Sequence, residues 1–203
     1  AYIFEPHEYY TQAAIETTLN EGLRVKTATR KFSIKGKEYD YGTYMIPVQD
    51  QELNSDEIYK LLNKVSKMYN VNFESHSTGI TDGIDFGSNN FIIVQQPKIG
   101  LIVGDGVRSY DAGEIWHLLD LRFDIPITKL DIGNLGYINL NKYSHIILPD
   151  YNGSRIDVDQ IKDYVDDGGN FIAYRNSTKW VSNNIDEIQM LSNDLVAKDI
   201  SFD

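Results

Sequence analysis

Histidines are the residues best suited to bind a metal or move protons, and the chain of 203 residues has four: His7, His76, His117 and His145. His117 and Asp120 stand three residues apart, which would bring two metal ligands together on one turn of a helix. A catalytic zinc site needs three protein ligands and a water, so this pair alone does not make one. The simpler interpretation is that His117 is a half-buried structural residue and that His145 belongs to an apolar strand.

Composition excludes several other chemistries. The chain has no cysteine, which rules out disulfides, thiolate metal sites and a cysteine nucleophile. Its formal net charge is −11 and its 19 basic residues are scattered, whereas phosphate backbones require clustered lysine and arginine. No apolar run approaches the roughly 20 residues of a membrane span. We therefore expect neither a nucleic-acid partner nor a membrane-spanning segment.

The beginning of the chain, Ala1–Glu5, has neither the basic start nor the apolar stretch of a signal peptide. These residues have the pattern of a strand, so we expect that the chain is cut from a longer protein. The lack of cysteine fits an exported bacterial protein, which makes a secreted or periplasmic location the expectation.

Strands and helices alternate along the chain, and this order predicts an α/β fold with a mostly parallel sheet covered on both faces. Gln95-Gln96-Pro97 marks a boundary, so we predict a smaller α/β lobe over 1–96 and a second α/β domain over 97–203. In the first lobe we expect strands at 2–4, 23–29, 39–48 and 71–74, a hairpin tip at 34–37, helices over 8–21 and from Ser55, and an exposed loop over 77–90. A stripe of Ile58, Leu61, Leu62, Val65 and Met68 predicts the buried face of the second helix.

The second domain begins with Lys98–Val103, a continuous apolar run typical of a parallel strand buried on both faces. Asp111 and Glu114 have the spacing of a capping box, which predicts the start of a helix. Later strands are expected at 125–130, 143–148 and 170–174, a helix with a Val158, Ile161 and Val165 stripe between the last two, and a final helix from Ser177.

Two short patterns in the second domain suggest alternative functions. Gly104-x-Gly106-x-x-Ser109 is a partial dinucleotide-binding fingerprint without its third glycine, and a tight strand-to-helix turn is the simpler interpretation. Asp105 and Asp150 follow strands as the acids of a phosphoacceptor receiver domain do, but the adjacent acidic pair is missing and no strand clearly precedes Lys179.

The stretch PKIGLIVGDGVRSYDAGEIWHLLDLRFDIPITKLD, followed by YSHIILPD, resembles the C-terminal region of bacterial zinc carboxypeptidase-like proteins. In that family a glutamine amidotransferase-like domain follows the peptidase domain, and LRVKTATRKFSIKGKEYDYGTYMIPVQDQ resembles the segment that links them. The resemblance covers roughly residues 1–180. It implies a class I glutamine amidotransferase-like (flavodoxin-like) fold for the second lobe.

The catalytic residues of that family can be sought one by one. The peptidase requires a His-x-x-Glu pair, and none exists here, so the resemblance implies that zinc is bound in an upstream domain of the same polypeptide. The amidotransferase nucleophile is a cysteine after a strand, and the matching position holds Arg175. No histidine follows residue 145 to act as its base. The loop that supplies oxyanion donors corresponds to Pro149–Gly153, where Asp150 would repel a developing oxyanion.

We therefore expect a non-catalytic accessory region of a zinc metallopeptidase, with no catalytic residue and no metal or cofactor of its own. Two interpretations are open for the tyrosines: an interface with the missing domain, or, more simply, ordinary strand residues. The tyrosines concerned include Tyr9, Tyr10, Tyr39, Tyr41 and Tyr44. The alternatives are a free-standing binding module for a small polar ligand or glycan, and a weak hydrolase that uses serine or aspartate. If a pocket remains, it should lie at the carboxyl ends of the strands. The candidate residues are Asp105, Gly106, Ser109, Tyr110, Asp150, Tyr151, Arg175 and Asn176, and Arg175 could close the site by pairing with Asp105 or Asp150.

Overall fold

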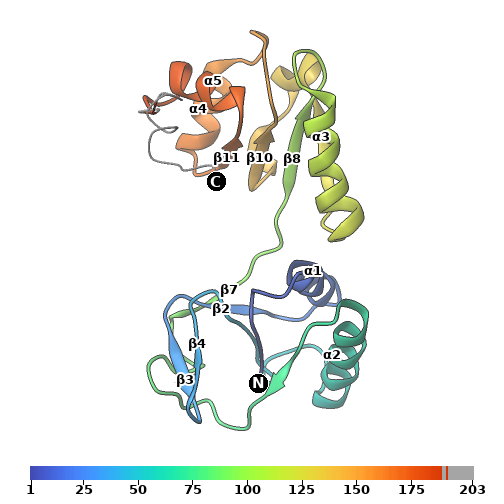
Figure 1. Cartoon of the computed structure of the whole chain (residues 1–203), viewed down its shortest axis with the longest axis vertical. Helices are drawn as coiled ribbons and strands as arrows, with labels where there is room; N and C mark the ends of the chain where they lie inside the picture. Colours follow the sequence, from blue (N-terminus) through green and yellow to red (C-terminus); the bar gives the residue numbers. More distant parts are fainter. Residues whose placement is uncertain (189–190, 192–203) are drawn as a thin grey trace, which may run out of the picture. The chain divides into compact units, whose positions relative to one another are not determined.

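The computed structural model of the chain describes residues 1–188 and 191, and it divides into two compact units (Figure 1). The first unit holds Ala1–Gln96 together with Leu118–Ile125. The second holds Pro97–His117 and the residues from Pro126 onward. The end of the predicted second domain, residues 192–203, lies outside the described residues. No helix in the described part is long and apolar enough to cross a membrane.

The first unit is built on a five-stranded sheet with the order β6-β1-β5-β2-β7, in which every neighbouring pair is antiparallel. The prediction of a mostly parallel sheet is therefore wrong for this unit, because α1 connects β1 to β2 and α2 connects β5 to β6 past an intervening strand that runs in the opposite direction. A separate hairpin, β3–β4, completes it. The elements are β1 (Tyr2–Phe4), α1 (Thr11–Asn20), β2 (Lys26–Ala28), β3 (Phe32–Ile34), β4 (Lys37–Tyr39), β5 (Tyr44–Ile46), α2 (Ser55–Tyr69), β6 (Glu74–Ser75) and β7 (Phe91–Ile93).

Both faces of this antiparallel sheet are covered by apolar clusters. Successive strand residues point to opposite sides and so enter different clusters. Phe4 and Ile46 pack with α1 and α2, whereas their neighbours Ile3 and Met45 pack with the β3–β4 hairpin. Ile84 and Phe86, which lie in the loop predicted to be exposed, are buried in the second cluster. Figure 1 shows the helices and the hairpin on opposite sides of the sheet.

Two local predictions in the first unit need correction. The predicted strand over 39–48 is interrupted between β4 and β5, where Gly42 has a φ of 83°, and β5 joins a different sheet. Helix α2 is capped by Asn54 rather than Ser55, with Glu57 completing the capping box. Ile58, Leu62 and Val65 are buried as predicted, but Met68 is 57% exposed.

The second unit contains a four-stranded sheet with the order β11-β10-β8-β9, and all of its strands are parallel. The predicted α/β class is confirmed at this level. Strand β8 lies inside the sheet, with β9 on one side and β10 on the other. The strand order therefore switches from one side of β8 to the other between β9 and β10. The elements are β8 (Ile99–Val103), α3 (Ser109–Trp116), a π-helical segment (His117–Arg122), β9 (Ile127–Asp131), 3-10 helices (Ile132–Tyr137 and Leu140–Lys142), β10 (His145–Leu148), α4 (Val158–Asp166), β11 (Asn170–Ala173) and α5 (Asn176–Asn184).

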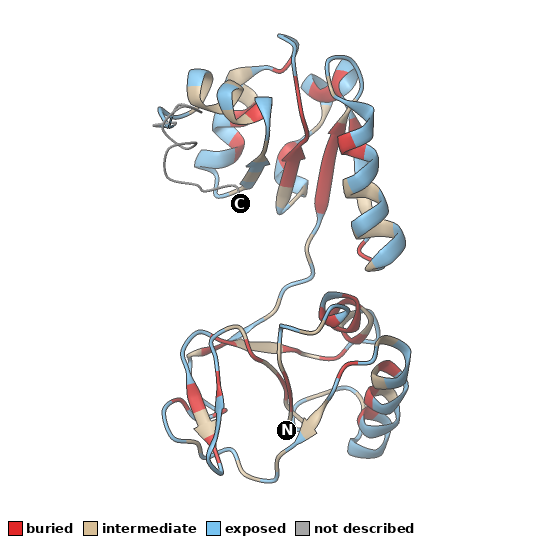
Figure 2. Ribbon diagram, in the orientation of Figure 1, coloured by how far each residue is buried: buried red, intermediate tan, exposed pale blue. Residues whose placement is uncertain are grey.

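Strand β8 is buried on both faces, as its apolar run predicts (Figure 2). Ile102 belongs to the main core, which also contains Ile161 of α4 and is contacted by Trp180 of α5. Leu101 points to the opposite face, where α3 lies. On α4 the buried pair is Ile161 and Tyr164, whereas Val165, placed in the stripe by the sequence, is 36% exposed.

Candidate functional site

The loops that follow β8, β10 and β11 bring several of the predicted pocket residues to the carboxyl edge of the parallel sheet. Asp150, directly after β10, is the best buried of the predicted charged residues, with 7% exposure. Its Oδ1 accepts a hydrogen bond from the backbone N–H of Asn176 at 3.3 Å. Its Oδ2 lies 3.4 Å from Nη1 of Arg108. The Asp150 carboxylate thus occupies the N-terminus of α5, where the helix dipole favours a negative charge.

Arg175 forms a sharp turn between β11 and α5, with φ 57° and ψ −129°. This combination is costly for a residue with a Cβ atom and is usually taken by glycine. Its guanidinium lies 3.2 Å, Nε to Oδ1, from Asp111 of α3. The expected closing ion pair therefore exists, but its acid is Asp111, because Asp150 is held by Arg108 and Asp105 by Arg155.

Asp111 is a site residue that sequence reasoning assigned to another role. It does not form a capping box: α3 begins at Ser109, and its N-cap residue Arg108 makes no side-chain cap bond. Asp111 is 3% exposed, and its Oδ2 is buried without a hydrogen-bond partner. The local sequence pattern carries no signal of this role, because the burial of Asp111 and its pairing with Arg175 arise only in the folded unit.

Tyr174 lies beside this pair, and its hydroxyl donates to the backbone oxygen of Asp111 at 3.4 Å. Burial, followed by the nearby Asp111 carboxylate, raises the pKa of Tyr174 to about 12. The phenol therefore stays neutral at physiological pH and cannot serve as a base there. The polar groups around Arg175 hold one another in place.

Tyr151 and Gly106 pack against each other where the loop after β8 contacts the loop after β10. Tyr151 is 2% exposed, and its hydroxyl accepts a hydrogen bond from the backbone N–H of Arg155 at 2.8 Å. A Cβ atom on Gly106 would lie only 2.9 Å from the Tyr151 ring. Glycine is thus required at 106 for close packing, which is a structural use of the fingerprint glycine rather than a ligand-binding one.

The remaining predicted pocket residues lie apart from this cluster. Asp105 is an exposed partner of Arg155, with 3.2 Å between the Arg155 Nη2 and Asp105 Oδ2 atoms. Tyr110 is 83% exposed. Ser109 is also exposed and faces a different cavity, between α3 and the sheet.

No group of three or more metal-ligating residues gathers anywhere in the described part of the chain. His117 is exposed rather than half-buried, at the start of the π-helical segment. The Nδ1 atom of His145 lies 2.9 Å from the Ser144 hydroxyl.

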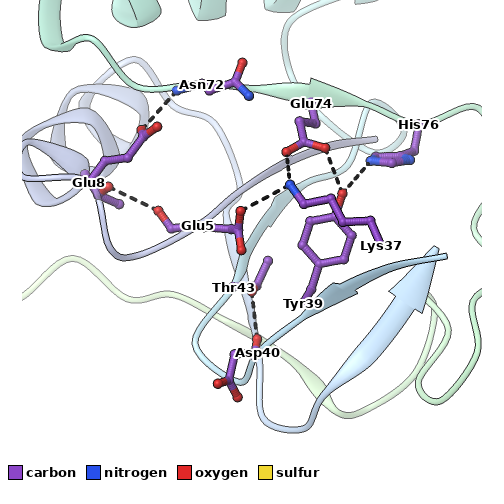
Figure 3. A network of polar contacts seen from close by, with 10 residues as sticks. Glu5, Glu8, Lys37, Tyr39, Asp40, Thr43, Asn72, Glu74 and His76 are labelled. Carbon is purple, nitrogen blue, oxygen red and sulfur yellow. Dashed lines mark hydrogen bonds and ion pairs between the residues drawn. The ribbon is translucent and has the colours of Figure 1, made fainter. Parts of the chain in front are cut away.

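A second polar cluster, in the first unit, was not predicted (Figure 3). The Tyr39 hydroxyl donates to Oε2 of Glu74 at 2.9 Å and lies 3.3 Å from Nε2 of His76. The Lys37 ammonium bonds Glu74 and reaches Oε2 of Glu5 at 3.2 Å. Tyr39 is 2% exposed, which removes it from the tyrosines expected at an interface. The cluster ties the β3–β4 hairpin to β1 and β6.

The charges of this cluster stabilise one another. Burial opposes ionisation of Glu74, but hydrogen bonds from Lys37 and Tyr39 outweigh it and lower the pKa of the carboxyl. The Glu74 hydrogen bond raises the pKa of Lys37. Burial, helped by Glu74, raises the pKa of Tyr39 to about 12. Burial lowers the pKa of His76 despite the nearby carboxylate. At neutral pH the arrangement is an ion pair with a neutral phenol and a neutral imidazole, which suits a structural tie.

The His76 shift predicts how stability depends on pH. Because the folded-state pKa lies below the ordinary value of 6.5, the unfolded chain binds the proton more readily. The contribution of His76 is therefore fully present above pH 6.5 and is lost as the pH falls towards the folded-state pKa. We expect a loss below about 1 kcal/mol between pH 7.5 and 5.5, because the ring is partly solvated. Urea unfolding should show it, and His76→Gln should reduce it; an NMR titration of His76 with a midpoint above 6.5 would contradict it.

Comparison with protein-family models, with curated proteins and with solved structures gives no match in any of the three. The parallel unit and its carboxyl edge are therefore interpreted from their own geometry.

Proposed function

We propose that this chain is a non-catalytic accessory region whose second unit is a degenerate amidotransferase-like domain. The observation that carries the proposal is the strained turn at Arg175. A strand, a residue with positive φ and a helix follow one another there, which is the arrangement that presents a nucleophile in α/β hydrolytic enzymes. A guanidinium is protonated at all relevant pH values and cannot attack a carbonyl.

The neighbouring contacts support the same proposal. In strand–turn–helix sites the N–H of the residue after the nucleophile stabilises the oxyanion. Here that residue is Asn176, and its N–H is already bound to the Asp150 carboxylate. A substrate oxygen would have to displace a buried negative charge, which opposes the development of a second negative charge beside it. The turn is retained, but Arg175 at the nucleophile position pairs with Asp111, and the Asn176 N–H at the oxyanion position binds Asp150.

We further propose that the partner of this region is an upstream zinc carboxypeptidase-like domain of the same polypeptide. The support is the resemblance of residues 98–150 to the region that follows such peptidases. In this proposal zinc and the peptidase chemistry belong to the upstream domain, and the present chain packs on it or positions its substrate. A secreted or periplasmic location is part of the same proposal.

An activity assay tests the non-catalytic part. We expect the purified chain to release no ammonia from glutamine and no C-terminal amino acid from peptides, with or without added zinc, above the rate of a heat-denatured sample. Turnover that Arg175→Ala or Asp150→Ala abolishes would overturn the proposal. A turnover unaffected by either variant would point to a contaminant, which repurification would remove.

The length of the native gene product tests the partner. A reading frame that continues upstream of Ala1 into a His-x-x-Glu segment is the expected result. A start codon or signal peptide directly before Ala1 would instead favour a free-standing binding module, and would leave the assignment of the Arg175 turn unchanged.

A further inference from the structure

A cavity of about 300 Å³ lies between α3 and the β8–β9 part of the parallel sheet. Its walls are mainly apolar, with Leu101 and Val103 from the sheet and Ala112 and Trp116 from the helix. The cavity opens to solvent, because Ser109, Gly113 and Lys129 of its lining are exposed. A space of this size is at the lower end of the range that small-molecule sites occupy.

Small residues on α3 create the space. The helix presents Ala112 and Gly113 to the cavity, where a helix packed on a sheet usually places larger side chains. A Cβ atom on Gly113 would meet no heavy atom within 4 Å. Glycine inside a helix costs roughly 0.5–1 kcal/mol relative to alanine, so neither packing nor helix stability accounts for this residue.

Two polar side chains line the cavity, and one of them is a cation. The Lys129 Nζ atom lies 4.7 Å from the centroid of the Trp116 ring. Across the described residues, none of the ion pairs includes Lys129. Ser109, at the first turn of α3, contributes a hydroxyl. An apolar space bordered by a lysine without a carboxylate partner is complementary to a molecule with an apolar body and one negative charge.

We propose that this cavity binds a small organic carboxylate with an aromatic or aliphatic body. The body packs against Leu101, Val103 and the Trp116 ring, and the carboxylate pairs with Lys129 while the Ser109 hydroxyl donates a hydrogen bond. This site differs in chemistry from the closed cluster around Arg175, and it does not depend on the accessory role proposed above.

Trp116 provides a direct signal for binding. The chain has two tryptophans, so a Trp180→Phe background leaves Trp116 as the single indole. Three probes are titrated against it: 3-phenylpropionate, its neutral amide and acetate. We expect saturable quenching by 3-phenylpropionate, binding of the amide about ten-fold weaker, and none by acetate, because both the apolar body and the charge contribute.

Three variants in the same background locate the site. Gly113→Leu should fill the cavity and abolish the quenching, with an unchanged circular dichroism spectrum. Lys129→Gln should weaken 3-phenylpropionate about ten-fold and leave the amide unaffected. Lys162→Gln, an exposed lysine on α4, is the matched control and should change nothing. The proposal is overturned by an absence of saturable binding at millimolar probe, by binding that survives Gly113→Leu, or by equal effects of the two lysine variants.

Discussion

Replacing Arg175 with alanine is expected to lower the free energy of unfolding by about 2–4 kcal/mol. The variant leaves the Asp111 carboxylate without its cation, at a position that is 3% exposed and where Oδ2 already has no hydrogen-bond partner. Removing one member of a buried pair is costly because the remaining charge stays desolvated. The figure is below the full value for a buried pair, since the arginine side chain is 55% exposed. Urea unfolding followed by circular dichroism measures the loss.

Two further variants separate the charge from the strained backbone. In Arg175→Ala with Asp111→Asn no buried charge is left unpaired, so a substantial part of the lost stability should return. Arg175→Gly should be more stable than Arg175→Ala by about 1 kcal/mol, because glycine accepts φ 57° and ψ −129° without steric cost. If alanine and glycine were equivalent, the strained turn on which the proposed function rests would be absent in solution.

Gly169→Ala is expected to destabilise the second unit by about 3 kcal/mol or more. A Cβ atom at this position would overlap the ring of Tyr164. That ring cannot move aside, because it is 2% exposed and its hydroxyl reaches the backbone oxygens of Tyr143 and Asn170, each at 3.3 Å. The same unfolding measurement applies.

Gly168→Ala is the matched control for this effect. Gly168 has φ 93°, but a Cβ there would meet no heavy atom within 4 Å. Only the backbone cost remains, about 1–2 kcal/mol. Similar losses for the two neighbouring variants would show that the Tyr164 packing does not restrict residue 169.

The hydrophobic pattern predicted best those elements in which nearly every residue is buried, such as β8. Lys98–Val103 identified β8 because every side chain of a central parallel strand is covered. The same reasoning failed for the first sheet, where strand direction depends on connections that a period of two does not encode. Met68 and Val165 failed because an apolar side chain at helical spacing does not reveal where the buried face ends.

The position of the candidate site could be predicted from the sequence, but the ion pairs between its residues could not. The rule that ligands and polar residues gather beyond the carboxyl ends of parallel strands placed Asp150, Tyr151, Arg175 and Asn176 at one edge. It could not show that α3 brings Asp111, rather than Asp105 or Asp150, to Arg175. The Lys37, Tyr39, Glu74 and His76 cluster was missed because its members come from segments more than 30 residues apart that only the folded sheet unites.

The pairing of β1 has a consequence for folding during synthesis. Tyr2 lies opposite Ile46 of β5 on one side and Ser75 of β6 on the other. At the usual pace of about 5–20 residues per second, the ribosome delivers that second partner several seconds after the first strand has emerged. Ile3 and Phe4 therefore remain without their final neighbours for this period, and a chaperone that shields apolar segments would have a target there.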